Sequence, residues 1–213
     1  MTNAKRTYTW RCGCGDLTFK IRGEPALNMN CHCHSCVAYA RFVDAQSEKI
    51  GGDGKGTSIL SEGDGVAMAC FWPDQVKITR DLASGRLNFV KVGHDGKPRR
   101  SYAKCCGTAM MGAEPRMWAL NRNCIFEEDA DSSGDDVLRR YEPEDKVCNV
   151  MKKHAFDPEK VPEPSADTVG FGDMVTFFGV LMNPLGKKIE KDVLETFRPS
   201  AESTVEVVPI TWE

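Results

Sequence analysis

Five sulfur- and nitrogen-bearing side chains lie within six consecutive positions of the stretch NCHCHSCVAYA. They are Cys31, His32, Cys33, His34 and Cys36. Thiolate and imidazole groups are the ligands that Zn²⁺ prefers in a tetrahedral site. On an extended backbone Cys31 and Cys33 point to one side and the two histidines to the other, so one ion cannot bind all five groups. The three cysteines therefore form the candidate metal site, and we expect both histidines to support it or to lie at the surface.

Three protein ligands leave the fourth position of a zinc ion open, which is typical of catalytic zinc. An open position can bind the sulfur of a substrate thiol, lower its pKa and keep it as a thiolate nucleophile. We therefore take Cys31, Cys33 and Cys36 as candidate catalytic and metal-binding residues. Two other interpretations stay open, because His34 or a distant residue could close a structural site, or the three thiols could be redox-active.

A second set of cysteines predicts a second zinc site. Cys12 and Cys14 form one close pair, and Cys105 and Cys106 form another before Gly107. Structural zinc sites usually draw four ligands from two such pairs. A site of this kind would join the first strand of the chain to a hairpin far downstream, and in small metal-dependent folds structural zinc contributes roughly 10–16 kcal/mol.

The chain has ten cysteines, a number that would indicate disulfides in a secreted protein. The N-terminal stretch MTNAKRTYTW lacks the apolar segment of a signal peptide, so we expect a cytoplasmic protein with metal-bound or free thiols. Cys70 and Cys124 lie among apolar residues and are expected to be buried. Cys148 has no evident partner in the sequence.

Composition indicates a soluble globular protein and argues against two classes of partner. The chain has 213 residues, of which 41% are hydrophobic and 28% charged, and its net charge is −3. No basic field favours nucleic acid or an anionic membrane. The longest mostly apolar stretch, MVTFFGVLM, is too short to cross a bilayer. We therefore expect neither nucleic acid nor a membrane as a partner.

Apolar periodicity favours a mainly β fold of short antiparallel sheets. Apolar residues alternate with polar ones over residues 17–21, the signal of a strand with one buried face. Residues 85–107 are predicted to form a hairpin with a turn at HDG, and residues 117–120 a further strand. Short helices are expected only in residues 36–45 and after Asp135.

The chain divides into three segments. Residues 8–126 are expected to form the zinc-binding catalytic domain, and residues 127–167 an acidic and Pro-rich connector. Residues 168–213 form an α/β extension that we expect to pack on the domain. Within it, residues 186–197 are predicted to form a helix and residues 204–213 a strand.

The glycine-rich stretch SEKIGGDGKGTSILSEGDG, residues 47–65, resembles a phosphate-binding loop only superficially. Gly56 separates Lys55 from Thr57, so the G-K-[ST] sequence that binds phosphate is missing. We expect a mobile surface loop here.

The motifs CGCG, CHCHSC and CCGTAM, in this order and spacing, resemble the glutathione-dependent formaldehyde-activating enzyme family, which also includes centromere protein V. The resemblance covers about residues 8–126. It implies a β-tent fold around two zinc ions, a structural one on the first cysteine pair and the late knuckle, residues 103–107, and a catalytic one on the Cys31, Cys33 and Cys36 triplet. It also implies the reaction that joins glutathione to formaldehyde as S-hydroxymethylglutathione, which is classed as a carbon–sulfur lyase in the reverse direction.

The late knuckle departs from the family pattern. The family has C-x-x-C-G-T at this place, whereas this chain reads YAKCCGT, with Ala103 in the place of the first cysteine. Either Cys105 and Cys106 both reach the metal through an altered turn, or Cys106 binds it and another ligand or a water completes the tetrahedron.

The resemblance also implies an anionic substrate and therefore cations near the zinc. Arg41, Arg99 and Arg100 are the candidates for binding glutathione; the alternative is that they are solvated surface charges. The function expected is a zinc-dependent carbon–sulfur lyase or synthase that acts on a thiol adduct of an aldehyde or a related electrophile. A zinc-stabilised binding module without catalysis and a thiol redox sensor are the alternatives.

Overall fold

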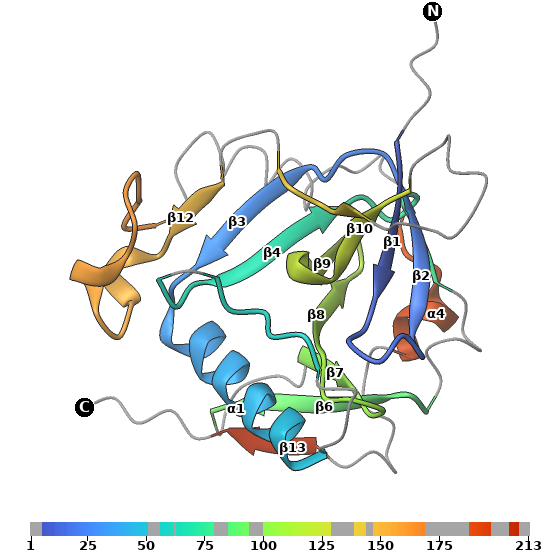
Figure 1. The fold of residues 1–213 in the computed structure, drawn as a ribbon, viewed down its shortest axis with the longest axis horizontal. Coiled ribbons are helices and arrows are strands. Elements are labelled where there is room, and N and C mark those ends of the chain that lie inside the picture. Colours follow the sequence, from blue (N-terminus) through green and yellow to red (C-terminus); the bar gives the residue numbers. More distant parts are fainter. Residues whose placement is uncertain are drawn as a thin grey trace, which may run out of the picture.

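The computed structural model describes residues 6–50, 56–61, 63–78, 85–93, 100–128, 139–143, 147–168, 188–196 and 205–208. These residues form two β-sheets and a single long helix, so the expected mainly β fold is confirmed (Figure 1). Within this part of the chain, no helix is long and apolar enough to cross a membrane. Arg99, the HDG turn and most of the acidic segment lie outside the described residues.

The smaller sheet has five antiparallel strands in the order β11-β10-β1-β2-β5. Their bounds are β1 Thr7–Arg11, β2 Thr18–Arg22, β5 Val76–Lys77, β10 Ile125–Glu127 and β11 Arg139–Arg140. The alternation predicted for residues 17–21 is present in β2, where Phe19 and Ile21 are buried and Lys20 between them is exposed. This sheet therefore turns one face to the core.

The larger sheet has eight strands in the order β12-β3-β4-β9-β8-β7-β6-β13. Their bounds are β3 Leu27–Cys31, β4 Val66–Phe71, β6 Leu87–Val92, β7 Arg100–Ala103, β8 Ala109–Glu114, β9 Met117–Asn121, β12 Cys148–Val150 and β13 Val205–Val208. The inner neighbours are antiparallel, but each edge strand is parallel to its neighbour, β12 to β3 and β13 to β6. Both edge strands come from segments expected to be the connector and the extension, and the domain boundaries stay a prediction.

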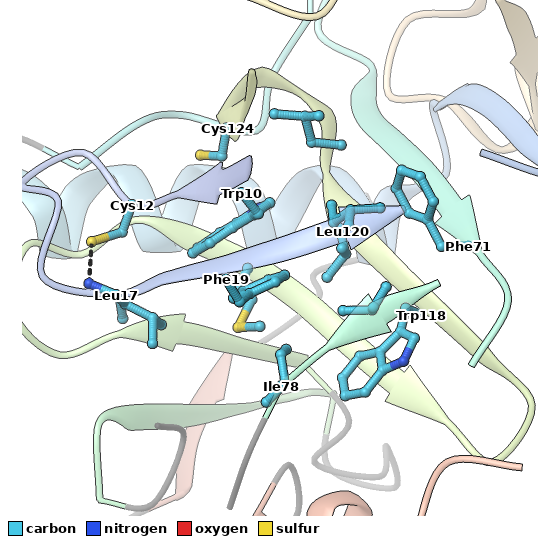
Figure 2. Close-up of a cluster of buried hydrophobic side chains, with 14 of the residues drawn as sticks. Trp10, Cys12, Leu17, Phe19, Phe71, Ile78, Trp118, Leu120 and Cys124 are labelled. Atoms are coloured by element: carbon cyan, nitrogen blue, oxygen red, sulfur yellow. Dashed lines mark hydrogen bonds between the residues drawn. The ribbon is translucent and has the colours of Figure 1, made fainter. Parts of the chain in front are cut away.

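Both faces of the larger sheet are buried. Every residue of β4 is buried, and its side chains alternate between two hydrophobic clusters. Phe71 belongs to the cluster between the two sheets, where Trp10 stacks on Phe19 with ring centroids 4.9 Å apart (Figure 2). Met68 belongs to the cluster between the larger sheet and the long helix. The core is therefore a three-layer arrangement with the larger sheet in the middle.

The long helix, α1 (His34–Ile50), extends beyond the expected residues 36–45 at both ends. Its buried residues recur every three or four positions, as an amphipathic helix on a sheet requires. Figure 1 shows α1 running from the end of β3 towards β6 and β13. The other helices within the described residues are η1 Arg122–Cys124, η2 Lys152–His154, η3 Pro158–Lys160 and α4 Lys191–Thr196.

The expectation of a mobile surface loop at residues 47–65 is wrong for residues 56–61. Ile59 is fully buried, and the Gly56 N–H donates to Ser47 Oγ at 2.7 Å. The Thr57 N–H donates to Thr108 Oγ1 at 3.1 Å. These buried contacts hold the segment against α1 and the late knuckle, whereas residues 51–55 lie outside the described residues.

Candidate metal centres

Four cysteines from two distant turns converge into one group, which we call the four-sulfur cluster. Cys12 and Cys14 lie in the turn between β1 and β2, and Cys105 and Cys106 lie in the turn between β7 and β8. Their four Sγ atoms all lie within 4.8 Å of one another. Because β1 and β2 belong to the smaller sheet and β7 and β8 to the larger one, the cluster joins the two sheets.

The spacing of these sulfurs fits a tetrahedral metal ion. A metal–sulfur bond of 2.3 Å places the sulfurs of a tetrahedron about 3.8 Å apart. Cys12 Sγ lies 3.5 Å from Cys14 Sγ and 3.8 Å from Cys105 Sγ, and the Sγ atoms of Cys105 and Cys106 lie 3.8 Å apart. Both cysteines of the altered knuckle therefore face the first pair, and the geometry favours the alternative in which both reach the metal.

Backbone and hydroxyl groups orient the four-sulfur cluster. The Leu17 N–H donates to Cys12 Sγ at 3.3 Å, drawn as the dashed line in Figure 2. Thr108 Oγ1 accepts the Gly13 N–H at 2.8 Å and lies 3.0 Å from Cys106 Sγ, to which its hydroxyl hydrogen can point. Such outer contacts hold thiolates in place and disperse their charge.

The late knuckle rests on the last turns of α1. Gly107 has a φ of 73°, and a Cβ on it would lie 2.6 Å from the Cα of Ser47. The Ser47 hydroxyl donates to the Cys106 carbonyl oxygen at 3.1 Å. Only glycine tolerates both this backbone angle and this close approach, so Gly107 is required for the turn that presents Cys106.

The second group, Cys31, Cys33 and Cys36, is the three-sulfur cluster. Cys31 ends β3 and Cys36 lies in the first turn of α1, so the junction of strand and helix brings the three sulfurs within 4.8 Å of one another. Cys31 Sγ and Cys33 Sγ are 3.5 Å apart, again a spacing that suits a shared metal ion. Within the described residues, no fourth Cys, His, Asp or Glu side chain completes the group.

Neither histidine joins the three-sulfur cluster. His32 is 2% exposed, and its Nε2 lies 3.3 Å from Asn149 Oδ1 on the edge strand β12. The ring of His34 packs edge-on against Phe156, with centroids 4.2 Å apart. Of the two histidines, His32 therefore has the position expected for a supporting residue, because it anchors the strand that carries Cys31.

The predicted cations have different surroundings. Arg100 Nη2 lies 3.7 Å from Cys36 Sγ and donates to Ser35 Oγ at 3.2 Å, so this guanidinium borders the three-sulfur cluster. Arg41 is half exposed, pairs with Asp64 at 3.3 Å and lies over the Phe156 ring. Arg99 lies outside the described residues.

Sequence reasoning missed two hydroxyl groups that contact the clusters. Ser35 Oγ lies 3.4 Å from Cys33 Sγ, and Thr108 bridges the two turns of the four-sulfur cluster. Ser35 lies inside the motif CHCHSC and Thr108 inside CCGTAM. Their positions next to candidate ligand cysteines could therefore have predicted these contacts.

Hydrogen bonding within each cluster makes one thiol ionise easily. Hydrogen bonds from Cys31 and Cys36 lower the pKa of Cys33 far below its ordinary value, although burial opposes the shift. A hydrogen bond from Cys12 lowers the pKa of Cys106 to about 4. Burial and a hydrogen bond with Cys14 raise the pKa of Cys105 to about 12. Each cluster thus offers one anionic sulfur at neutral pH, which favours capture of a cation.

The remaining cysteines lie apart from both clusters. Cys70 and Cys124 are 3% and 0% exposed, as their apolar neighbours predicted. Burial raises the pKa of each thiol to about 12. Cys148 is partly buried against the cluster between the larger sheet and α1.

The fold and the two clusters together define a mainly β protein with two cysteine sites able to hold metal ions. The model of the glutathione-dependent formaldehyde-activating enzyme family matches residues 7–43, which include β1, β2, β3 and five of the seven cluster cysteines. The resemblance to this family is therefore confirmed over residues 7–43, a shorter span than the expected 8–126. No curated protein sequence matches the chain.

Proposed function

We propose that this chain is a zinc-dependent carbon–sulfur lyase or synthase acting on the adduct of an aldehyde, such as formaldehyde, with a thiol such as glutathione. The observation that supports this function most directly is the three-sulfur cluster, which no fourth ligand closes within the described residues. Zinc sites with three protein ligands and one exchangeable position are typically catalytic. The match to a family named for glutathione-dependent formaldehyde activation supplies the substrate class.

The roles of the residues follow from their contacts. Cys31, Cys33 and Cys36 would hold the zinc, which, when bound, supplies a position where a thiol substrate binds as a thiolate. Ser35 Oγ, 3.4 Å from Cys33 Sγ, orients a ligand sulfur through a hydrogen bond. The four-sulfur cluster would hold a second zinc that connects the two sheets.

Arg100 supplies the positive charge at the proposed site. Three thiolates around one divalent ion leave a net charge of −1, and a bound substrate thiolate adds another negative charge. The Arg100 guanidinium, 3.7 Å from Cys36 Sγ, offsets this charge and can also receive a carboxylate of glutathione. Arg41 is engaged by Asp64 and Phe156, so we assign it a secondary role at most.

Adduct exchange tests the proposal directly. The zinc-loaded full chain is mixed with glutathione and formaldehyde, and exchange between free and adduct forms is followed by NMR. We expect the wild-type chain and the Cys148→Ser variant to accelerate exchange, and the Cys33→Ser variant to lose the acceleration together with one zinc per chain. Exchange at the uncatalysed rate with the zinc-loaded wild type, or full activity in Cys33→Ser, would count against the enzyme and favour a binding module.

The role of Arg100 has a matched test in Arg41. We expect Arg100→Gln to lower the catalytic efficiency with glutathione adducts by about 10–100-fold, the usual cost of losing a hydrogen bond to a charged group. Arg41→Gln serves as the control and should change the efficiency less than threefold, a small effect for an exposed ion pair of roughly 0.5 kcal/mol. Equal losses in both variants would contradict the assignment of Arg100.

A further inference from the structure

The four-sulfur cluster has one sulfur that faces solvent. Cys12 and Cys106 are buried and Cys14 is half-buried, whereas Cys105 is exposed. Cys105 also lines an open cavity of about 550 Å³. Among the described residues, its lining consists of Asp16, Leu17, Gly85, Arg86, Lys104 and Cys105. A small molecule can therefore reach this sulfur without unfolding the chain.

The surroundings of this cavity favour an anion. Of the described residues that line it, Arg86 and Lys104 are positively charged and Asp16 is negatively charged. Arg86 Nη1 donates to the Asp16 carbonyl oxygen at 2.9 Å, which holds the guanidinium at the rim of the cavity. The Arg11 guanidinium lies against the neighbouring turn at Gly15. Arg11 Nη2 is only 2.7 Å from the position that a Cβ on Gly15 would take. Anionic molecules are concentrated beside Cys105 by this field.

The altered knuckle explains why the sulfur is exposed. Ala103 occupies the place where the C-x-x-C-G-T pattern has its first cysteine, and it is fully buried on β7. This chain instead carries its fourth sulfur on Cys105, in the exposed turn. The substitution therefore moves one ligand from a protected strand to an accessible position.

We propose that Cys105 is a thiol–disulfide exchange site for a small anionic disulfide, of which glutathione disulfide is the type. The Cys105 thiolate attacks one sulfur of the disulfide, a bond forms between Cys105 Sγ and that sulfur, and the other half leaves as a thiolate. One protein thiol is oxidised, and the disulfide is reduced by the same two electrons.

The exchange affects the four-sulfur cluster and not the proposed active site. The modified Cys105 is lost as a ligand, so the link between the two sheets weakens. Cys36 belongs to the three-sulfur cluster, and Ser47 contacts Cys106 of the four-sulfur cluster. These two residues stand eleven positions apart on α1, about 16 Å along the helix axis. The exchange can therefore occur whether or not the three-sulfur cluster performs catalysis.

Mass spectrometry of the metal-loaded full chain tests the proposal. The chain is incubated with glutathione disulfide, and the adduct is located by peptide mapping. We expect one glutathionyl group on Cys105, no adduct in Cys105→Ser and an unchanged adduct in Cys148→Ser. An adduct mainly on another cysteine, or none on the wild type, overturns the proposal.

A charge comparison keeps the test valid if Cys105→Ser fails to fold. The exchange rate with glutathione disulfide is divided by the rate with cystamine, a cationic disulfide of similar reactivity. We expect the Arg86→Gln, Lys104→Gln double variant to lower this ratio by at least about fivefold at low salt, and added salt to lower the wild-type ratio as well. A ratio unchanged by both the double substitution and the salt overturns the role of the cavity.

Discussion

At the residue scale, the clusters depend on groups that are not metal ligands. Thr108 is fully buried, and its hydroxyl accepts the N–H groups of Gly13 and Thr57 while lying 3.0 Å from Cys106 Sγ. One oxygen thus fastens the turn of the first cysteine pair and residues 56–61 of the glycine-rich stretch to the late knuckle. A buried polar atom with several partners is costly to remove because its partners lose their hydrogen bonds inside the protein.

Replacing Thr108 by valine tests this bridge. Valine keeps the shape but removes the acceptor of two partly buried N–H groups, those of Gly13 and Thr57, so we expect Thr108→Val to lower the free energy of unfolding by roughly 1–3 kcal/mol. Urea unfolding of the metal-loaded chain measures the loss, and Thr108→Ser, which keeps the hydroxyl, should recover most of it. A loss below about 1 kcal/mol in Thr108→Val would show that water satisfies these groups.

At the element scale, the position of the three-sulfur cluster depends on the edge strand β12. Asn30 on β3 and His32 directly after it contact Asn149 on β12, with distances to its Oδ1 of 3.0 Å and 3.3 Å. The His32 N–H also donates to the Val150 carbonyl oxygen at 3.1 Å. Arg122 Nη2 donates to Asn30 Oδ1 at 2.7 Å and extends the network to η1. These contacts fix the end of β3, from which Cys31 projects.

Loss of Asn149 should loosen this edge. Asn149→Leu leaves the buried His32 ring and the partly buried Asn30 amide without their acceptor, so we expect amide exchange in β3 and β12 to accelerate by about 10–100-fold, as the loss of roughly 1.4–2.8 kcal/mol implies. Hydrogen–deuterium exchange measures the change, and amides of β8 and β9 serve as the internal reference. Asn149→Asp, which retains an acceptor, should show a smaller effect; equal exchange in wild type and Asn149→Leu would argue that β12 does not position the cluster.

The helix α1 connects the two clusters. Its first turn carries Cys36, and Ser47 near its last turn holds the Cys106 carbonyl oxygen. The predicted helix at residues 36–45 was too short because polar residues at its end gave a weak apolar signal, whereas burial of Ser47 against the knuckle requires a longer helix. A contact with another segment thus decides where this helix ends.

At the scale of the whole molecule, the larger sheet excludes water from both of its faces. Cys70 on β4 and Cys124 at the end of η1 are therefore buried thiols whose pKa values rise to about 12. In the unfolded chain a thiol ionises near pH 8.5 to 9. Below that pH both states keep the proton, so the thiols have no effect on stability. Between about pH 9 and pH 12 only the unfolded state releases it, so stability falls as the pH rises.

This linkage predicts alkaline destabilisation that one substitution can reduce. Each buried thiol should lower the free energy of unfolding by about 1.4 kcal/mol per pH unit above pH 9. Urea unfolding under reducing conditions at pH 8 and pH 10.5 measures the slope. Cys70→Ala should be less stable than wild type at pH 8 but should lose less stability on going to pH 10.5. If both chains lose the same amount, Cys70 ionises in the folded state.

Much of the architecture could be predicted because its signals are local. The alternation in residues 17–21 corresponds to β2, and the strand expected at residues 117–120 corresponds to β9. The edge strands β12 and β13 are only three and four residues long and pair in parallel with distant partners. The strand expected at residues 204–213 corresponds to β13, whereas no strand was expected at β12. The pairing partner of each follows only from contacts far along the chain.

Short motifs indicate which cysteines lie together within each turn. In C-x-C and C-x-C-x-x-C, the ligands are so close along the chain that local backbone geometry brings their sulfurs to one point, and the triplet Cys31, Cys33 and Cys36 was identified in full. Contacts between distant segments bring Cys105 and Cys106 both to the first pair, and they place Arg100 rather than Arg41 beside the triplet. Those neighbours come from different sheets and strands. The direction of their side chains depends on strand register and layer packing, which short-range sequence patterns do not specify.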